Sequence, residues 1–107
     1  FKRFWGAYGN EPVDERVVYD PNAPLPNQFV GPVHCAEPSN DGLIYVCDRG
    51  ADRIQVFRPD GTFVKEGQVA PLTLAGSTWD ISFSHDDDQE FIYVADCAYF
   101  NLHILLR

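Results

Sequence analysis

Basic residues are scarce in this sequence. Lysine and arginine together number 8 against 16 aspartates and glutamates, so the formal net charge is −8 at pH 7. A nucleic-acid backbone or an anionic membrane surface attracts the opposite charge. The balance therefore argues against nucleic acid and acidic lipid as the main partner, and it indicates a soluble, self-repelling surface.

Long apolar runs and methionine are both absent. No stretch approaches the about 20 apolar residues that a membrane-spanning helix needs, so we expect no membrane span. The chain opens on Phe1, without the charged, apolar and small-residue pattern of a secretory signal peptide. We therefore expect a processed, trimmed or fragmentary N-terminus.

Cysteine is limited to Cys35, Cys47 and Cys97, and no CxxC or CxxCH motif occurs. The odd count leaves at least one thiol unpaired within the chain, and the spacing gives no support to a zinc ribbon, a thioredoxin-like site or haem attachment. Common catalytic signatures are also missing, among them the serine nucleophile elbow, the phosphate loop and HExxH.

An internal repeat is the main feature that the sequence does contain. The segment "IYVCDRGADRIQVF", residues 44–57, aligns without a gap with "IYVADCAYFNLHIL", residues 92–105. Tyr45 thus recurs as Tyr93, 48 residues later. A period in the forties with short strands is typical of propeller blades, each a four-stranded antiparallel sheet.

Alternating apolar residues and turn signals predict eight strands and no helix. Residues 1–9 read as one isolated strand, residues 29–67 as a complete four-stranded unit with Asp-Gly turns, and residues 78–106 as a three-stranded unit. The proline-containing residues 10–28 are expected to form an extended loop.

Residues 40–67, "NDGLIYVCDRGADRIQVFRPDGTFVKEG", resemble the NHL repeat, the unit of six-bladed β-propellers. The resemblance covers most of the chain except residues 10–28. It implies an all-β fold of antiparallel four-stranded blades, here about two blades with the strand order d, a-b-c-d, a-b-c. It is informative about the fold and says little about activity.

A blade buries its faces only against neighbouring blades. The resemblance therefore implies further blades, either from the rest of a longer chain or from a homo-oligomer. The order d, a-b-c-d, a-b-c suggests one such assembly, a trimer in which residues 1–9 of each chain complete the last blade of another. A truncated or partial chain is the simpler alternative.

In propellers, ligands usually lie on the face formed by the b–c loops and the d–a connections. The resemblance places Arg49, Asp52, Trp79, Tyr99 and Phe100 on this face. Two exposed rings in the second b–c loop would suit stacking on a sugar or a peptide. The alternatives are that the rings pack on a neighbouring loop and that the charged residues of the first loop are solvated or paired with one another.

Two aspartates and one cysteine of the repeat are expected to have structural roles. Asp48 and Asp96 follow equivalent strands and are expected to accept hydrogen bonds from loop N–H groups. Cys47 replaces Ala95 of the second copy, so we expect a small buried apolar residue.

His34 and Cys35 are the strongest candidates for metal chemistry. Adjacent strand residues point to opposite faces, so they cannot both bind one ion without a bulge. His34 instead aligns with Asp80, and the two could form a partial site for zinc, copper or calcium. Peptide-amidating lyases, which are propellers, bind metal through Pro-His-Gly, whereas this chain has Pro-Val-His-Cys at residues 32–35. The alternative is a hydrogen-bonded histidine that lines a channel.

Together these features favour a non-catalytic binding scaffold that recognises a peptide, protein or sugar on its top face. The alternative is a metal-dependent lyase or hydrolase of propeller type that uses His34 and Asp80. The acidic composition and the resemblance to exported proteins favour an extracellular or periplasmic location.

Overall fold

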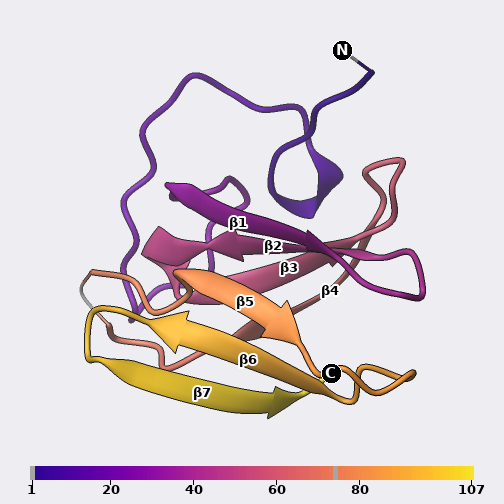
Figure 1. Ribbon diagram of the computed structural model, residues 1–107. Coiled ribbons are helices and arrows are strands. Elements are labelled where there is room, and N and C mark those ends of the chain that lie inside the picture. The colour runs from indigo at the N-terminus through magenta and orange to yellow at the C-terminus, as the bar shows by residue number, and fades with distance from the viewer. Residues whose placement is uncertain (1, 74) are drawn as a thin grey trace.

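Two antiparallel β-sheets form this all-β protein, as the sequence predicts (Figure 1). The computed structural model describes residues 2–73 and 75–107. The four-stranded sheet has the order β1-β2-β3-β4, and the three-stranded sheet has the order β5-β6-β7. The strands are β1 (Val33–Pro38), β2 (Ile44–Asp48), β3 (Arg53–Phe57), β4 (Phe63–Gln68), β5 (Asp80–Phe83), β6 (Phe91–Asp96) and β7 (Asn101–Leu106). Two short 3-10 helices, η1 (Ala7–Gly9) and η2 (Arg49–Ala51), complete the regular elements.

Seven of the eight expected strands are present, and the strand expected in residues 1–9 is not found in residues 2–9. Tyr8 and Gly9 have φ angles of 58° and 78°, so the backbone turns into η1 and does not remain extended. The ring of Trp5 packs on Phe57 with a centroid distance of 5.8 Å. The segment therefore lies against the first sheet, where Trp5 and Tyr8 are half-buried, and residues 2–9 pair with no strand there.

The described residues contain no closed propeller, since each of the two sheets is open. No helix in residues 2–73 and 75–107 is long and apolar enough to cross a membrane.

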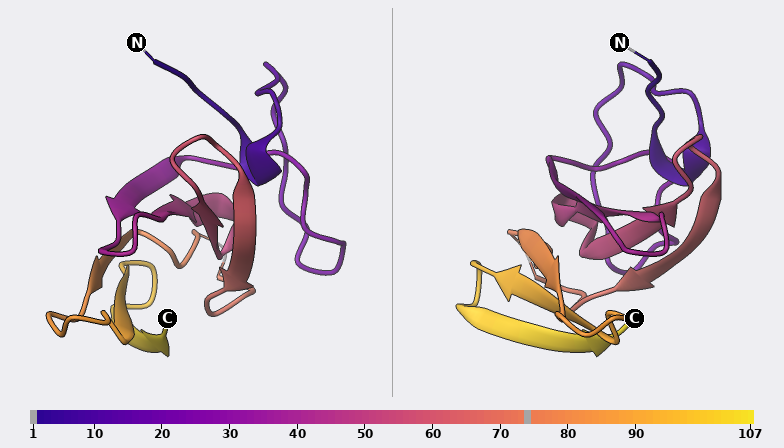
Figure 2. Two further views of the ribbon diagram at one scale, coloured as in Figure 1. Left: turned by 90° about the vertical axis from the view of Figure 1, so that its right-hand side faces the viewer. Right: turned by 45° about the vertical axis from the view of Figure 1, so that its right-hand side comes forward.

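The main core lies between the two sheets, which approach each other at their first strands, β1 and β5 (Figures 1 and 2). Tyr45 of β2 makes an edge-to-face contact with Phe83 of β5, with ring centroids 5.0 Å apart. The buried residues of this core are Cys35, Tyr45, Cys47, Ile54, Val56, Val69, Ile81, Phe83, Ile92 and Val94.

The two sheets are stacked in the same orientation. Tyr45 and Cys47 belong to the core between the sheets, whereas Ile92 and Val94 are the core residues of β6. Because side chains alternate along a strand, Tyr93 lies on the opposite face of the second sheet. The first sheet packs on the second sheet through the face that holds Tyr45 and Cys47. The equivalent face of the second sheet, which holds Tyr93, points outward.

A disulfide joins Cys35 of β1 to Cys47 of β2, with the two Cα atoms 4.9 Å apart. The strand register places these residues opposite each other. Cys47 is buried, as expected, but the prediction that it acts only as a small apolar residue is wrong. Cys97 is the remaining, exposed thiol.

Residues 10–30 cover the outer face of the first sheet through a buried arginine. The side chain of Arg53 is fully buried, and its Nε donates to a carboxylate oxygen of Asp48 at 2.9 Å. Its terminal nitrogens donate to the carbonyl oxygens of Pro26 (3.0 Å) and Gln28 (2.9 Å). The expectation that the charged residues of this loop are solvated or paired with one another is wrong for Arg53, which is paired outside the loop.

We expect the double substitution Cys35→Ser and Cys47→Ser to lower the free energy of unfolding. The disulfide closes a loop with a sequence separation of 12, and the loss of this constraint costs about 3 kcal/mol. Urea titration measures the change. Cys97→Ser is the matched control and should leave the midpoint unchanged, and an equal loss in that variant would contradict the role of the disulfide.

Substitution of Arg53 by alanine should be strongly destabilising. It leaves the buried Asp48 carboxylate without its cation, and breaking such a pair costs about 3–5 kcal/mol. Arg58→Ala, at an exposed position at the end of β3, should change stability by no more than about 0.5 kcal/mol. Thermal unfolding and limited proteolysis within residues 10–30 report both effects. Equal behaviour of the two variants would exclude the proposed anchoring of this segment.

Candidate functional site

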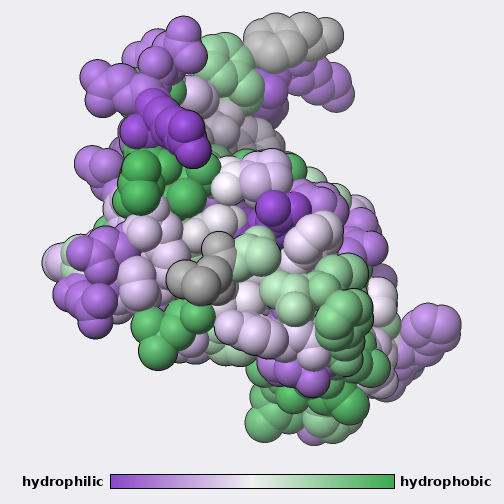
Figure 3. Space-filling model, turned by 90° about the vertical axis from the view of Figure 1, so that its left-hand side faces the viewer, coloured by the Kyte–Doolittle hydropathy of each residue, from purple (hydrophilic) through white to green (hydrophobic). Residues whose placement is uncertain are grey.

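Several loops gather at one end of the two sheets, which we call the loop end. It contains the β2–β3 loop with η2, the β4–β5 connection (69–79), the β6–β7 loop (97–100) and part of residues 10–32. The loop end lies on the left in Figure 1 and faces the viewer in Figure 3. This is the face on which the sequence predicts ligand binding.

Trp79 is the central side chain of the loop end. Its indole N–H donates to the carbonyl oxygen of Gly76 at 2.7 Å, which fixes the ring at the start of β5. The guanidinium carbon of Arg49 lies 4.1 Å from the centroid of the ring. The imidazole of His34 lies 5.1 Å away, and its Nδ1–H donates to the carbonyl oxygen of Trp79 at 2.6 Å. Trp79 thus joins η2, β1 and β5.

Arg49 lacks a counterion among the described residues. Its Nε is buried and has no hydrogen-bond partner in residues 2–73 and 75–107, and no carboxylate there forms an ion pair with it. An arginine stays protonated, so the cation persists despite partial burial. The ring of Trp79 compensates part of the desolvation through a cation–π contact.

A cavity of about 330 Å³ opens beside Arg49. Four segments contribute to its lining, with residues 16–19 and 21, 30–31, 49–50, and 72, 73 and 75. Arg16 and Arg49 contribute the cationic side chains, and Tyr19 and Leu72 contribute an aromatic ring and an exposed apolar side chain. The cavity therefore combines positive charge with apolar surface on a chain whose net charge is negative.

Asp52 is placed inside the structure, away from any ligand. It is fully buried, and its carboxylate accepts the N–H groups of Ser77 (2.8 Å) and Thr73 (3.2 Å). Burial raises the pKa of this carboxyl, and the hydrogen bonds from Ser77 and Thr73 oppose that shift. Asp52 therefore anchors the β4–β5 connection, and its burial conflicts with the prediction that it contacts a ligand.

Tyr99 and Phe100 are exposed, as a role in stacking requires, with 56% and 93% of their surface accessible. Asp96 shapes their loop by accepting the N–H groups of Ala98 (3.0 Å) and Tyr99 (3.3 Å). This confirms the expectation for Asp96. No ring contact joins Tyr99 or Phe100 to Trp79 within the described part of the chain.

Asp48 does not accept hydrogen bonds from the described residues of the loop that follows its own strand, although the sequence predicts them. Its carboxylate accepts the N–H groups of Val30 and Gly31. These groups belong to residues 10–32 and not to the loop that follows β2, so the equivalent aspartates of the two repeats anchor different segments.

The two predicted metal ligands lie near the starts of neighbouring strands. His34 is on β1, and Asp80 begins β5, where its carboxylate accepts the N–H of Ile81 at 3.0 Å. The disulfide removes Cys35 as a partner for His34 in metal binding. Residues 2–73 and 75–107 contain no group of three or more His, Cys, Asp or Glu side chains that could hold a metal ion.

The sequence predicts Arg49 and Trp79 on this face, but not Arg16 and Tyr19, which line the cavity with Arg49 through the path of residues 10–32. No local signal marks such residues, since the contacts depend on how a long loop folds over the sheet. Comparison with family models, curated proteins and solved structures finds no match to this chain.

Removal of the Asp52 side chain should loosen the β4–β5 connection. Asp52→Ala deprives two buried N–H groups of a charged acceptor, and each such hydrogen bond contributes about 1.5–3 kcal/mol. We expect lower stability and faster hydrogen exchange at Thr73 and Ser77. Asp60→Ala is the control, because Asp60 accepts the N–H of Thr62 in an exposed turn. Unchanged exchange at Thr73 and Ser77 in the Asp52 variant would contradict the anchoring role.

Proposed function

We propose that this protein is a non-catalytic binding scaffold of NHL-type repeats, and that its loop end recognises a peptide, a protein or a sugar. In this proposal the two sheets are neighbouring blades of a propeller. The four-stranded antiparallel meander, the 48-residue repeat and the stacking of both sheets in one orientation support it.

One observation carries the assignment to the loop end. Arg49 is a partly buried cation without an ionic partner among the described residues, and it lies over Trp79 beside the cavity of about 330 Å³. An unpaired buried charge costs free energy unless a partner compensates it. A ligand with a carboxylate or another anionic group would supply that partner, while Tyr19 and Leu72 of the cavity lining offer apolar contacts.

Further blades remain part of the proposal, either from the rest of a longer chain or from other copies. The assembly in which residues 1–9 of one chain complete the last blade of another receives no support from the contacts. Trp5 packs on Phe57, and the Tyr8 hydroxyl donates to Glu66 at 2.8 Å, so both residues are engaged with their own first sheet.

Export from the cytoplasm is also part of the proposal. The disulfide between Cys35 and Cys47 is the supporting observation, because such bonds persist mainly in oxidising compartments. The acidic surface agrees with this location and does not require it.

The binding proposal can be tested by fluorescence. A Trp5→Phe background leaves Trp79 as the sole tryptophan, since the sequence contains two. This protein is titrated with short peptides that carry carboxylates, with their amidated counterparts, and with acidic and neutral oligosaccharides. We expect a probe with a carboxylate to change the emission of Trp79.

Arg49→Ala should weaken that binding about tenfold or more, because a hydrogen bond to a charged group contributes about 1.5–3 kcal/mol. Arg58→Ala, which keeps the same net charge as Arg49→Ala, should bind like the parent protein. Binding that is equal in the Arg49 and Arg58 variants, or absent for every probe, would refute the proposed site.

A further inference from the structure

The cavity beside Arg49 carries positive charge that no acidic residue of its lining balances. Arg16 and Arg49 line it, and neither forms an ion pair with a carboxylate in residues 2–73 and 75–107. No aspartate or glutamate is among the described residues of the lining, although the chain contains 16 of them. An anionic group of a ligand is therefore favoured here, whereas the ammonium group of a free amino acid would remain unpaired.

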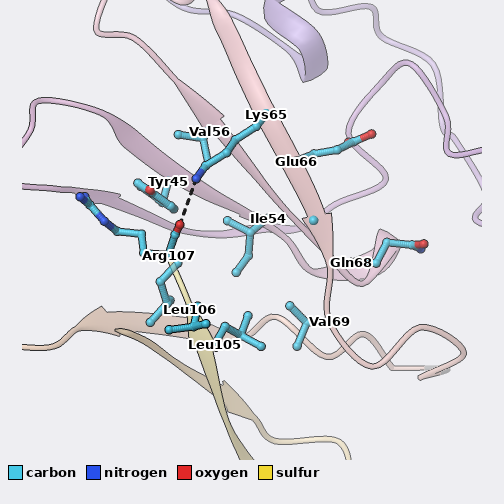
Figure 4. A pocket seen from close by; sticks show the side chains of 12 residues that line it. Tyr45, Ile54, Val56, Lys65, Glu66, Gln68, Val69, Leu105, Leu106 and Arg107 are labelled. Carbon is cyan, nitrogen blue, oxygen red and sulfur yellow. Dashed lines mark hydrogen bonds between the residues drawn. The ribbon is translucent and has the colours of Figure 1, made fainter. Parts of the chain in front are cut away.

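The cavity between β4 and β7 differs in this respect (Figure 4). It measures about 170 Å³, and Lys65 and Arg107 are the cations of its lining. The Nζ of Lys65 donates to the carbonyl oxygen of Arg107 at 3.3 Å, and the guanidinium of Arg107 pairs with Asp41 at 3.1 Å. Both cations have partners within the chain. Unpaired cations are therefore a property of the cavity beside Arg49 and not of every cavity in the described residues.

The other walls of the cavity beside Arg49 are mainly apolar. Val18 and Leu72 are 78% and 62% exposed, so both retain apolar surface that a ligand can cover. The described residues of the lining include no asparagine, glutamine, aspartate or glutamate, the side chains whose oxygens would accept hydrogen bonds from sugar hydroxyls. The walls therefore favour a ligand with an apolar body over an acidic sugar. The apolar lining residues are Val17, Val18, Pro21, Val30, Leu72 and Ala75.

The volume of the cavity limits how much of a ligand can enter it. Ligand pockets in proteins measure about 300–1,000 Å³, and this cavity, with about 330 Å³, lies at the lower end of that range. The space holds the end of a peptide with its last side chain, whereas an extended segment that continues in both directions needs a longer groove. A ligand therefore enters with one end.

The polar groups of the cavity match a carboxylate that follows a peptide carbonyl. The Nε–H and one Nη–H of a guanidinium lie side by side and bind the two oxygens of a carboxylate. The Nε of Arg49 has no hydrogen-bond partner among the described residues. The hydroxyl of Tyr19 accepts a hydrogen bond from the Nε2 of Gln68 at 3.1 Å. Its own proton can therefore be donated to a carbonyl oxygen of the ligand.

We propose that the cavity beside Arg49 binds the C-terminal residue of a polypeptide and selects an apolar last side chain. This inference rests on the proposed binding at the loop end and names its ligand class. In a C-terminal valine, leucine or phenylalanine, the carboxylate and the apolar side chain are attached to the same carbon atom, so both reach neighbouring walls of a small cavity. An internal aspartate or glutamate lacks this apolar group beside its carboxylate.

Each wall has one role in this arrangement. Arg49 binds the carboxylate, and the exposed Arg16 adds positive charge in the same cavity. Val18 and Leu72 contact the apolar side chain. Capture of a C-terminal carboxylate is a recurring mode of peptide recognition.

The test titrates the Trp5→Phe protein with acetylated tetrapeptides and follows the emission of Trp79, which contacts Arg49. The reference peptide ends in Gly-Gly-Leu with a free carboxylate. We expect its C-terminal amide to bind about tenfold or more weakly than the acid, because the charged hydrogen bonds are lost. A peptide that ends in glycine should show a loss of about the same size, because no apolar side chain is buried. An amidated peptide with an internal glutamate should bind as weakly as the amide.

Val18→Ser combined with Leu72→Ser tests the apolar wall. Both side chains are exposed, so the unfolding midpoint should stay near that of the parent. We expect the preference for leucine over glycine to fall about threefold or more, since burial of one methylene group favours binding about fourfold. The preference for the acid over the amide should be kept. Val13→Ser, at an exposed position outside the lining, is the control and should change neither preference.

Three outcomes would overturn this proposal and leave the loop-end site intact. Equal binding of the leucine and glycine peptides would exclude selection of an apolar side chain. Binding of the internal glutamate peptide as tight as that of the leucine peptide would exclude a C-terminus as the ligand. Equally tight binding of isocaproate or of an acidic oligosaccharide would assign the cavity to another class of anion. Absence of binding for every probe, in contrast, would contradict the proposed function itself and this inference with it.

Discussion

The buried ion pair between Arg53 and Asp48 is the interaction on which the arrangement of the loop end depends. A fully buried guanidinium requires both a counterion and acceptors for its remaining N–H groups. Asp48 supplies the charge, and the carbonyl oxygens of Pro26 and Gln28 accept two of the remaining hydrogen bonds. The carboxylate of Asp48 also binds the N–H of Val30. A loop with little regular structure is thereby fixed across the first sheet, and one wall of the cavity beside Arg49 forms.

The two repeats differ in this ion pair, which is present only in the first repeat. One period after Arg53 stands Asn101, which is exposed, and the aspartate of the second repeat pairs instead with His103 at 3.2 Å. The first sheet is covered on one face by the polar network and residues 10–30, and on the other by the second sheet. The outer face of the second sheet has no comparable cover within the described residues. The repeat therefore produces one buried unit and one unit with an open edge.

Strands could be predicted from the sequence wherever a local residue pattern determines the backbone conformation. Alternation and Asp-Gly turns located seven strands, because these signals act within a few residues. Residues 2–9 form no strand, because the backbone turns into η1 at Tyr8 and Gly9 while Trp5 packs on Phe57. The disulfide could not be predicted from the sequence either, because the number of cysteines does not reveal which strand residues lie opposite each other. Only the pairing of β1 with β2 places Cys35 opposite Cys47.

The sequence by itself determined the repeat, its strands and turns, and the loops that share one end, because a period and an alternation describe short-range geometry. Only the tertiary structure determined whether each charged side chain is unpaired, buried in an ion pair or exposed. Arg49, Arg53 and Arg58 look alike in the sequence, yet the first is unpaired among the described residues, the second is buried in an ion pair and the third is exposed. The physical reason is that desolvation and counterions depend on segments tens of residues away, and these meet only when residues 10–32 fold over the sheet.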